Sequence, residues 1–339
     1  MADPERTIMQ VKKSKNIFQL KPGWVFNPWL DFICFYLPII VPVFFELPNL
    51  REILILKVTF DTGHVFATLV PLYFFRKSGM VNMKSLLVKA FAVLAVLQIV
   101  CFFYFPIFTY LLGYYALFHI GAQLYGWLAK IQRTSLHPIL TFDLILERVF
   151  LIFMLLSSIL FWHTTYSEMK KSYFYDGNLA VPISFGVWQI LNWLFLGFLF
   201  IWLARLFYNL VVRKFFPMGK VYLLLSVWLM FYWNLVFNHS RQFGFNFFWF
   251  SFVLNHGLTY LVHVFISNEK LITKERKTLP SFLFFLSGIF LIGVVWSLIA
   301  PRMVTLDFRY AAILVWGPLI LHYVIDATIW RSSFLKHKI

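Results

Sequence analysis

The most regular feature of the chain is a succession of long apolar runs separated by short polar segments. Most runs are long enough to cross the hydrocarbon core of a bilayer as an α-helix, which takes about 20 residues. The pattern therefore predicts an all-α fold, a polytopic transmembrane helical bundle. We expect ten spans, near residues 28–48, 51–75, 86–106, 107–130, 140–163, 182–211, 220–238, 244–267, 280–300 and 309–330.

Composition supports a membrane protein over a soluble one. Only 13% of the 339 residues are charged and 61% are hydrophobic, whereas a typical soluble domain has about 25% charged residues. This excludes a secreted disulfide scaffold, a collagen-like chain, a disordered tail protein and a nucleic-acid-binding domain. The two cysteines, Cys34 and Cys101, both lie inside apolar runs, so we expect small buried side chains and not a redox pair.

The positive charge is distributed unevenly along the chain. The net charge is +16, but 20 of the 30 Lys and Arg lie on the side that holds both termini, against six on the opposite side. This is the positive-inside bias, which predicts cytoplasmic termini and accounts for the basic excess without a nucleic-acid partner. We expect a basic cytoplasmic arm (1–27), one transmembrane domain (28–331) and a cytoplasmic tail (332–339).

Four histidines lie near the middle of separate predicted spans. Counted from the outer ends, His64, His119, His256 and His322 are each 12 or 13 residues into their spans, and all four spans run in the same direction. At about 1.5 Å rise per residue, they lie close to one depth near the bilayer midplane. Ionisable groups at that depth face the bundle interior and need partners, so this set is a candidate functional site.

Two carboxylates lie one helical turn from these histidines. Asp61 is three residues before His64 and Asp326 is four residues after His322, so each shares a helix face with its histidine. Each can bind a metal ion or orient a ligating imidazole of a neighbouring helix. His263 is on the same helix face as His256, two turns deeper, where it can serve a second metal or a proton path. Hydrogen-bonded packing inside the membrane is the alternative interpretation of the histidines.

A second acidic pair, Asp143 and Glu147, lies in the inner half of the fifth span. For this pair we favour an internal ion-pair cluster with Arg148 or Arg205 over a catalytic carboxylate pair. The remaining histidines fall at helix ends, in a loop and in the tail, where solvated or interfacial roles are expected: His163, His239, His137 and His337.

Prolines and polar residues shape the neighbourhood of the candidate site. Pro71 and Pro318 lie close to His64 and His322 and are expected to kink their spans. Gln123 and Tyr125 follow His119 and would bring an amide and a phenol into the same interior, either in the site or as contacts between helices.

Several short motifs together resemble a known group of proteins. They are Asp61-Thr62-Gly63-His64 with Val65 and Thr68, Phe118-His119 with Gln123 and Tyr125-Gly126-Trp127, and His322-Tyr323-Val324-Ile325-Asp326 with Ile329-Trp330-Arg331, preceded by Asn27-Pro28-Trp29-Leu30-Asp31. In this order they are similar to the polar motifs of a group of uncharacterised multipass bacterial inner-membrane proteins. The resemblance implies that His64, His119, His322 and Asp326 form one site, in a bacterial inner membrane, and names no reaction.

The leading hypothesis is a membrane-embedded metalloenzyme. His64, His119, His256 and His322 would be ligands, with Asp326, Asp61 or His263 completing or orienting them. Imidazole and carboxylate suit iron, zinc or copper, and an apolar enclosure suits oxygen chemistry, so we expect iron that hydroxylates or desaturates a lipid-like substrate with electrons from a donor protein. The alternatives are a proton-coupled transporter or channel, a non-covalent haem protein and a zinc-dependent lipid hydrolase.

Overall fold

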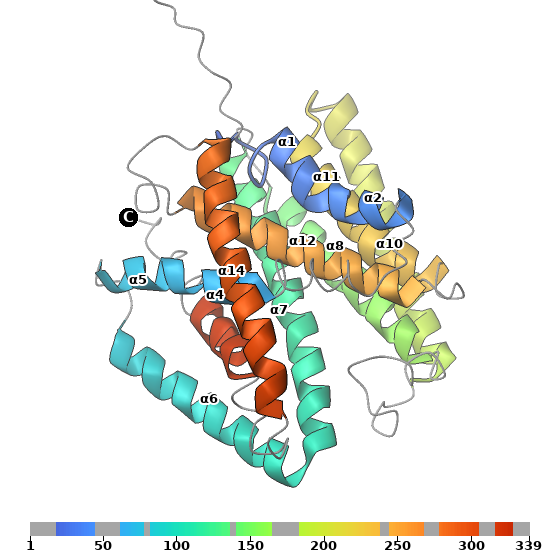
Figure 1. Cartoon of the computed structure of the whole chain (residues 1–339). Helices are drawn as coiled ribbons and strands as arrows, with labels where there is room; N and C mark the ends of the chain where they lie inside the picture. Colours follow the sequence, from blue (N-terminus) through green and yellow to red (C-terminus); the bar gives the residue numbers. More distant parts are fainter. Residues whose placement is uncertain are drawn as a thin grey trace, which may run out of the picture.

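The computed structural model describes residues 18–44, 62–77, 82–135, 140–164, 183–237, 244–267, 278–304 and 316–327, and within these ranges the chain is helical without a strand. Figure 1 shows the arrangement. The elements in chain order are α1 (Pro28–Asp31), η2 (Phe32–Tyr36, a π-helix), α2 (Leu37–Phe44), α4 (Gly63–Ala67), α5 (Leu69–Lys77), α6 (Met83–Phe103), α7 (Phe105–Thr134), α8 (Thr141–Thr164), α10 (Phe185–Val211), α11 (Met218–Val227), η4 (Trp228–Phe237, a π-helix), α12 (Gly244–Ser267) and α14 (Leu279–Val304). A last helix covers residues 316–327.

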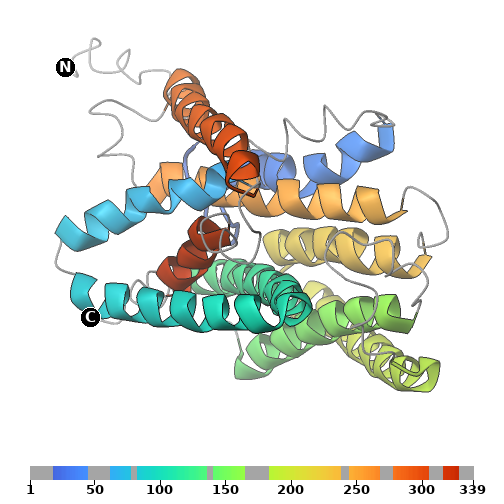
Figure 2. The same ribbon diagram turned by 60° about the horizontal axis from the view of Figure 1, so that its bottom comes forward.

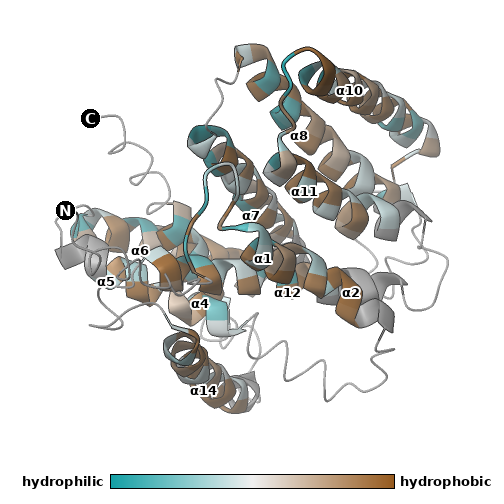
Figure 3. Cartoon of the chain, turned by 90° about the horizontal axis from the view of Figure 1, so that it is seen from above, coloured by the Kyte–Doolittle hydropathy of each residue, from teal (hydrophilic) through white to brown (hydrophobic). Residues whose placement is uncertain are grey.

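Four of these helices are long and apolar enough to cross a membrane, as expected for a membrane protein: α6, α8, α10 and α14. Many of their large apolar side chains face outward. In α10 only 6% of the apolar window is buried, and Trp193, Phe200 and Phe207 are exposed. Hydrophobic residues run along α10 and α14 in Figure 3. Such surface would be unfavourable in water but suits contact with lipid.

The described helices fall within or close to the predicted apolar runs. The predicted span 244–267 has the same bounds as α12, and 182–211 contains α10. The break expected at Pro106 is present, since α6 ends at Phe103 and α7 starts at Phe105 with proline in its first turn. A proline there costs no hydrogen bond. The two helices meet in the sharp corner at the bottom of Figure 1. Ten crossings and cytoplasmic termini remain predictions.

The run predicted at 51–75 contains a helix break in its described part. α4 ends at Ala67 and α5 starts at Leu69. Pro71 has no N–H for the carbonyl of residue 67, so it interrupts the regular hydrogen-bond pattern there. The break leaves Thr68 fully buried between the two helices, close to His64. Pro318 lies in the described part of the last helix, residues 316–327, and the kink expected there stays a prediction.

The segment before α1 is folded against the helices. Phe18, Val25 and Phe26 are at most 1% exposed. The buried carboxylate of Asp31 accepts hydrogen bonds from the backbone N–H groups of Val25 and Phe26, at 3.0 and 2.9 Å. Part of the segment expected to be a cytoplasmic arm, namely Phe18, Val25 and Phe26, therefore packs into the core, while residues 19–22 stay exposed.

Helix α12 lies at the centre of the molecule (Figure 1). Residues 251–262 are all buried, and α12 contacts η2, α2, α4, η4 and α14. The Nδ2 of Asn255 donates to the carbonyl of Cys34, at 2.8 Å. That carbonyl belongs to the π-helix η2, where the hydrogen-bond register is shifted. Asn255 thereby fixes α12 against the first helical segment, one residue before His256.

The contact between Gly219 and Gly23 gives a prediction for stability. A Cβ at Gly219 would lie 2.0 Å from the carbonyl oxygen of Gly23. Gly219→Ala should therefore destabilise the protein by about 1 to 3 kcal/mol through overpacking, although alanine favours a helix. Thermal unfolding in detergent measures the change. Gly197→Ala is the matched control, since nothing lies within 4 Å of its Cβ position. Equal melting temperatures for both variants would contradict the prediction.

Candidate metal centre

Four histidines from four different elements meet in the interior. His64 comes from α4, His119 from α7, His256 from α12 and His322 from the 316–327 helix. His64, His256 and His322 are at most 4% exposed. The ring of His64 lies 4.6 Å from that of His256 and 4.8 Å from that of His322, and the ring of His119 lies 5.1 and 5.0 Å from the same two rings. The structure thus brings together the four residues expected at one depth.

Asp326 joins the histidines from the last helix. Its Oδ2 lies 3.8 Å from Nε2 of His119 and 3.7 Å from Nε2 of His322. The 316–327 helix lies beside α7 in Figures 1 and 2, and Tyr323 packs against Tyr115 of α7 with ring centroids 5.1 Å apart. This packing holds Asp326 against His119.

A chain of hydrogen bonds connects Asp326 to the opposite nitrogen of His322. The hydroxyl of Tyr260 donates to Oδ1 of Asp326, at 2.8 Å, so its oxygen is left to accept from Thr68, at 2.8 Å. The Oγ1 of Thr68 in turn lies 2.5 Å from Nδ1 of His322. Because the hydroxyl of Thr68 donates its hydrogen bond to Tyr260, the same oxygen accepts a hydrogen bond from Nδ1–H of His322. The chain therefore fixes the proton of His322 on Nδ1 and a lone pair on Nε2.

His256 is held in the same way. Its Nδ1 lies 2.6 Å from Oε1 of Gln123, an atom that only accepts. The proton is then on Nδ1, and the lone pair of Nε2 points to His64, whose Nε2 is 3.1 Å away. Two of the four histidines thus turn an unprotonated Nε2 into the cluster, each oriented by a hydrogen bond on its outer side. Such outer hydrogen bonds are the usual support of metal-ligating histidines.

Two of the atoms that face the middle of the cluster lack hydrogen-bond partners within the described part of the chain. Nε2 of His119 and Nε2 of His322 are buried and have no hydrogen-bond partner among the described residues. Both face Oδ2 of Asp326 across less than 4 Å. The lone pair of His322 and the carboxylate repel each other there, and a buried unsatisfied acceptor costs about 1 to 3 kcal/mol. A cation between these atoms would remove the repulsion between His322 and Asp326 and would also satisfy the buried acceptor.

The donor atoms are suitably placed for a metal ion. Among the described residues, two groups have all ligand atoms within 4.8 Å of one another: His64, His256 and His322, and His119, His322 and Asp326. A metal with ligands at about 2.1 Å holds neighbouring ligand atoms roughly 3.0 to 3.4 Å apart. Small side-chain movements would therefore close either group around an ion. The two groups share His322, so this residue can contribute to an ion in either one.

The spacing noted between His322 and Asp326 recurs at all four histidines. Each of the four histidines is followed four residues later by a polar side chain, namely Thr68, Gln123, Tyr260 and Asp326. Residues four apart share a helix face, so each helix presents a histidine and a hydrogen-bonding group one turn away. Tyr260 in particular was missed, because a tyrosine in an aromatic-rich run is hard to distinguish from packing.

The other candidate residues lie elsewhere or outside the described ranges. His263 belongs to neither ligand group; its ring packs 5.0 Å from that of Trp127. His163 is buried and hydrogen-bonds to Tyr114. Asp61 lies outside the described residues, as do the other three histidines, His137, His239 and His337.

The acidic pair on α8 forms the expected ion-pair cluster. The Nε of Arg205 donates to Asp143 at 2.5 Å, and Arg213 approaches the same carboxylate at 3.7 Å. Lys220 donates to Glu147 at 2.5 Å, and Gln132 donates to the other oxygen of Glu147 at 2.6 Å. Arg148 takes a different direction. Its guanidinium lies over the ring of Tyr125, 5.1 Å from the centroid.

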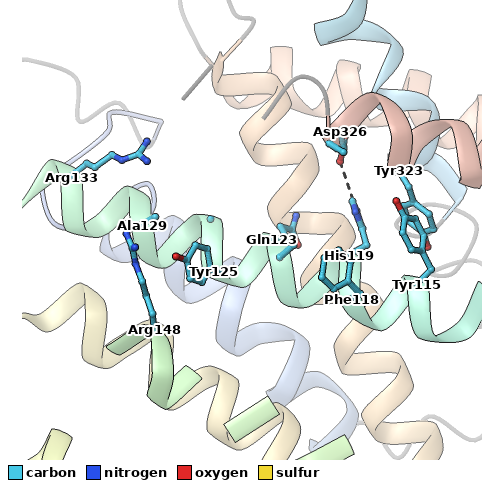
Figure 4. Close-up of a pocket in the computed structure, with 13 residues that line it drawn as sticks. Tyr115, Phe118, His119, Gln123, Tyr125, Ala129, Arg133, Arg148, Tyr323 and Asp326 are labelled. Carbon is cyan, nitrogen blue, oxygen red and sulfur yellow. Dashed lines mark ion pairs between the residues drawn. The ribbon is translucent and has the colours of Figure 1, made fainter. Parts of the chain in front are cut away.

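A cavity of about 410 Å³ opens beside the histidine cluster. Figure 4 shows it extending along α7, with His119 and Asp326 at one end and Arg133 and Arg148 at the other. A volume of this size suits a small organic ligand. The cavity reaches His119 and Asp326. It is lined by Tyr115, Phe118, His119, Ala122, Gln123, Tyr125, Gly126, Ala129, Arg133, Arg148, Tyr323, Asp326 and Ala327.

Comparison with known proteins returned no relative: no family model, no curated protein and no solved structure matches this chain. The fold and the site therefore define the class, a helical membrane protein with a buried cluster of histidines and a carboxylate.

The ion pair between Lys220 and Glu147 gives a second stability prediction. Both side chains are less than a tenth exposed, so Lys220→Met leaves a buried carboxylate without its cation. Loss of one partner of such a pair costs about 3 to 5 kcal/mol, measurable by denaturant titration of the purified protein. The double variant Lys220→Met with Glu147→Gln should recover much of that loss. A single variant as stable as the parent would contradict the assignment.

Proposed function

We propose that the protein is a membrane-embedded metalloenzyme with a non-haem iron centre that hydroxylates or desaturates a hydrophobic, lipid-like substrate. The observation that carries the proposal is the meeting of the Nε2 lone pair of His322, Oδ2 of Asp326 and Nε2 of His119, without a hydrogen bond to either histidine nitrogen among the described residues. Two histidines and one carboxylate are the ligand set of many non-haem iron oxygenases. The same set also binds catalytic zinc, and the apolar enclosure, which suits oxygen chemistry, leads us to propose iron.

The remaining residues orient the ligands. Thr68 and Gln123 hold the outer nitrogens of His322 and His256, and Tyr260 holds the other oxygen of Asp326. His64, with its ring centroid 4.8 Å from that of His322, and His256, with its ring centroid 5.1 Å from that of His119, would supply further imidazoles. When bound, iron would supply the activation of dioxygen. The apolar surroundings would keep water from the reacting carbon.

The reaction needs an electron donor besides the substrate. In hydroxylation, one oxygen atom of O₂ enters a C–H bond and the other leaves as water, with two electrons and two protons supplied from outside. In desaturation, two hydrogen atoms leave the substrate and both oxygen atoms become water, with the same external supply. We therefore propose a donor protein as a partner, at a bacterial inner membrane with both termini in the cytoplasm.

Bound haem is disfavoured by the spacing of the histidines. A porphyrin ring would have to lie between two axial imidazoles. In the cluster, the Nε2 atoms of His64 and His256 are in hydrogen-bond distance, and the rings of His119 and His322 are 5.0 Å apart. A single ion fits this arrangement better.

Metal content is the direct test of the proposal. Protein purified without chelators should contain about one iron per chain, and His119→Ala and His322→Ala should lose most of it, because both are ligands in the proposed centre. Elemental analysis of monodisperse protein gives the ratio. His163→Ala is the matched control, since His163 is buried but bonded to Tyr114, and it should retain the metal. Active parent protein without metal would refute the proposal.

The role of the outer hydrogen bonds can be tested separately. Thr68→Val keeps the side-chain shape but removes the acceptor for His322, and metal affinity should fall about 10- to 100-fold. Chelator competition measures the affinity. Thr259→Val is the control, because the hydroxyl of Thr259 donates to the carbonyl of Asn255 in its own helix. Equal affinities for the two variants would show that Thr68 does not orient a ligand.

Proton-coupled transport is the second candidate. The same acceptor atoms around Asp326 could hold a proton in place of a metal ion, and the hydrogen-bond chain from His322 to Asp326 could pass it on. Proton flux in liposomes that is abolished by Asp326→Asn and unaffected by chelators would favour transport.

A further inference from the structure

We infer that the cavity beside the histidine cluster binds a single-chain anionic amphiphile, with a phosphate or carboxylate head between Arg133 and Arg148 and its apolar chain directed at His119 and Asp326. As a statement about the substrate, this rests on the proposed function. As a statement about binding, it stands on the shape and charge of the cavity alone (Figure 4).

The middle of the cavity is a smooth apolar floor on one face of α7. Ala122, Gly126 and Ala129 line it, and their spacing of four and three residues places them in one row along the helix. No atom lies within 4 Å of the position that a Cβ of Gly126 would take. The row therefore has open space above Gly126, bordered by small apolar side chains that an alkyl chain can lie against.

One end of this floor is positively charged. The guanidinium of Arg148 lies over the ring of Tyr125, and both residues line the cavity. The Nε of Arg148 is buried and has no hydrogen-bond partner among the described residues. The nearby carboxylates on α8 are engaged by other cations, since Asp143 pairs with Arg205 and Glu147 with Lys220. An anionic ligand in the cavity would pair with the guanidinium of Arg148, since other cations hold both of these carboxylates.

The position of Arg133 indicates how deep in the membrane the head group of the ligand would lie. Arg133 lies in the last turn of α7, and His119 lies near the middle of that helix. Along the axis, Arg133 is about 21 Å and Tyr125 about 9 Å from His119 at 1.5 Å per residue. In the predicted span 107–130, Arg133 lies just beyond the cytoplasmic end, at the level of the lipid head groups. An amphiphile in the cavity would thus have the same orientation as in a bilayer leaflet.

Two exposed aromatic side chains in the cavity wall indicate how such a ligand could enter. Phe118 and Tyr115 line the cavity and are 69% and 44% exposed. Their outward-facing rings border the surrounding apolar phase, so an alkyl chain can move in laterally while its head stays at the interface. The metal end would then meet a carbon of the chain and not the head group.

Ligand binding to the metal-loaded protein in phosphatidylcholine nanodiscs tests the inference. The probes are dodecyl phosphate, laurate, dodecyltrimethylammonium and inorganic phosphate, measured by calorimetry against empty nanodiscs. Dodecyl phosphate and laurate should bind at least tenfold more tightly than the other two. Arg148→Gln and Arg133→Gln should each weaken that binding about 10- to 100-fold, the range that the loss of a hydrogen bond to a charged group gives. Gly126→Leu should abolish it by filling the floor.

Matched variants separate specific binding from general effects. Lys84→Gln removes an exposed positive charge away from the cavity, and Gly197→Leu adds the same side chain at a glycine of α10 that also has nothing within 4 Å. Both should bind like the parent. Equal binding of the cationic probe, equal binding of inorganic phosphate, or unchanged binding in both arginine variants would overturn the inference.

Metal analysis of the same samples keeps the two proposals distinguishable. Arginine-dependent binding of the anionic probes to active protein that contains no metal would refute the iron centre and leave the anion site in place. Full metal content without a preference for anionic probes would refute the inference and leave the iron centre in place.

Discussion

The structure depends on the burial of four imidazoles and a carboxylate inside an apolar helical bundle. With little water available, every polar atom there must find a partner within the protein or on a bound ion. The outer atoms are satisfied by Thr68, Gln123 and Tyr260, but the inner nitrogens of His119 and His322 are not. The cluster can form only where α4, α7, α12 and the last helix pack closely, so it constrains how these four helices are arranged.

Much of the helical layout could be predicted because apolar runs leave few alternatives. The bounds of α12 and the break before Pro106 followed from hydropathy and proline alone. The central histidines could also be found, because a chain with 13% charged residues has few polar groups at mid-membrane. What they bind could not be predicted, since an imidazole that holds a metal and one that only packs have the same spacing in sequence.

Other features depend on tertiary contacts that no local pattern encodes. The direction of Arg148 is one example. Its sequence neighbour Glu147 suggests an ion pair, but Lys220 occupies that carboxylate and Arg148 turns to Tyr125 and the cavity. The packing of residues 18–27 is another, because it relies on Asp31 accepting two backbone N–H groups and on the absence of a side chain at Gly219.

The pairing of each central histidine with a polar residue four positions later also fixes how the helices slide against one another. Apolar helix faces rich in Phe and Leu pack almost equally well after a shift of one turn, about 5.4 Å. Such a shift would move Thr68, Gln123, Tyr260 or Asp326 into the layer of histidines and break the hydrogen bonds that join neighbouring helices. The polar pairs thus set the relative positions of helices whose apolar faces alone would not determine them.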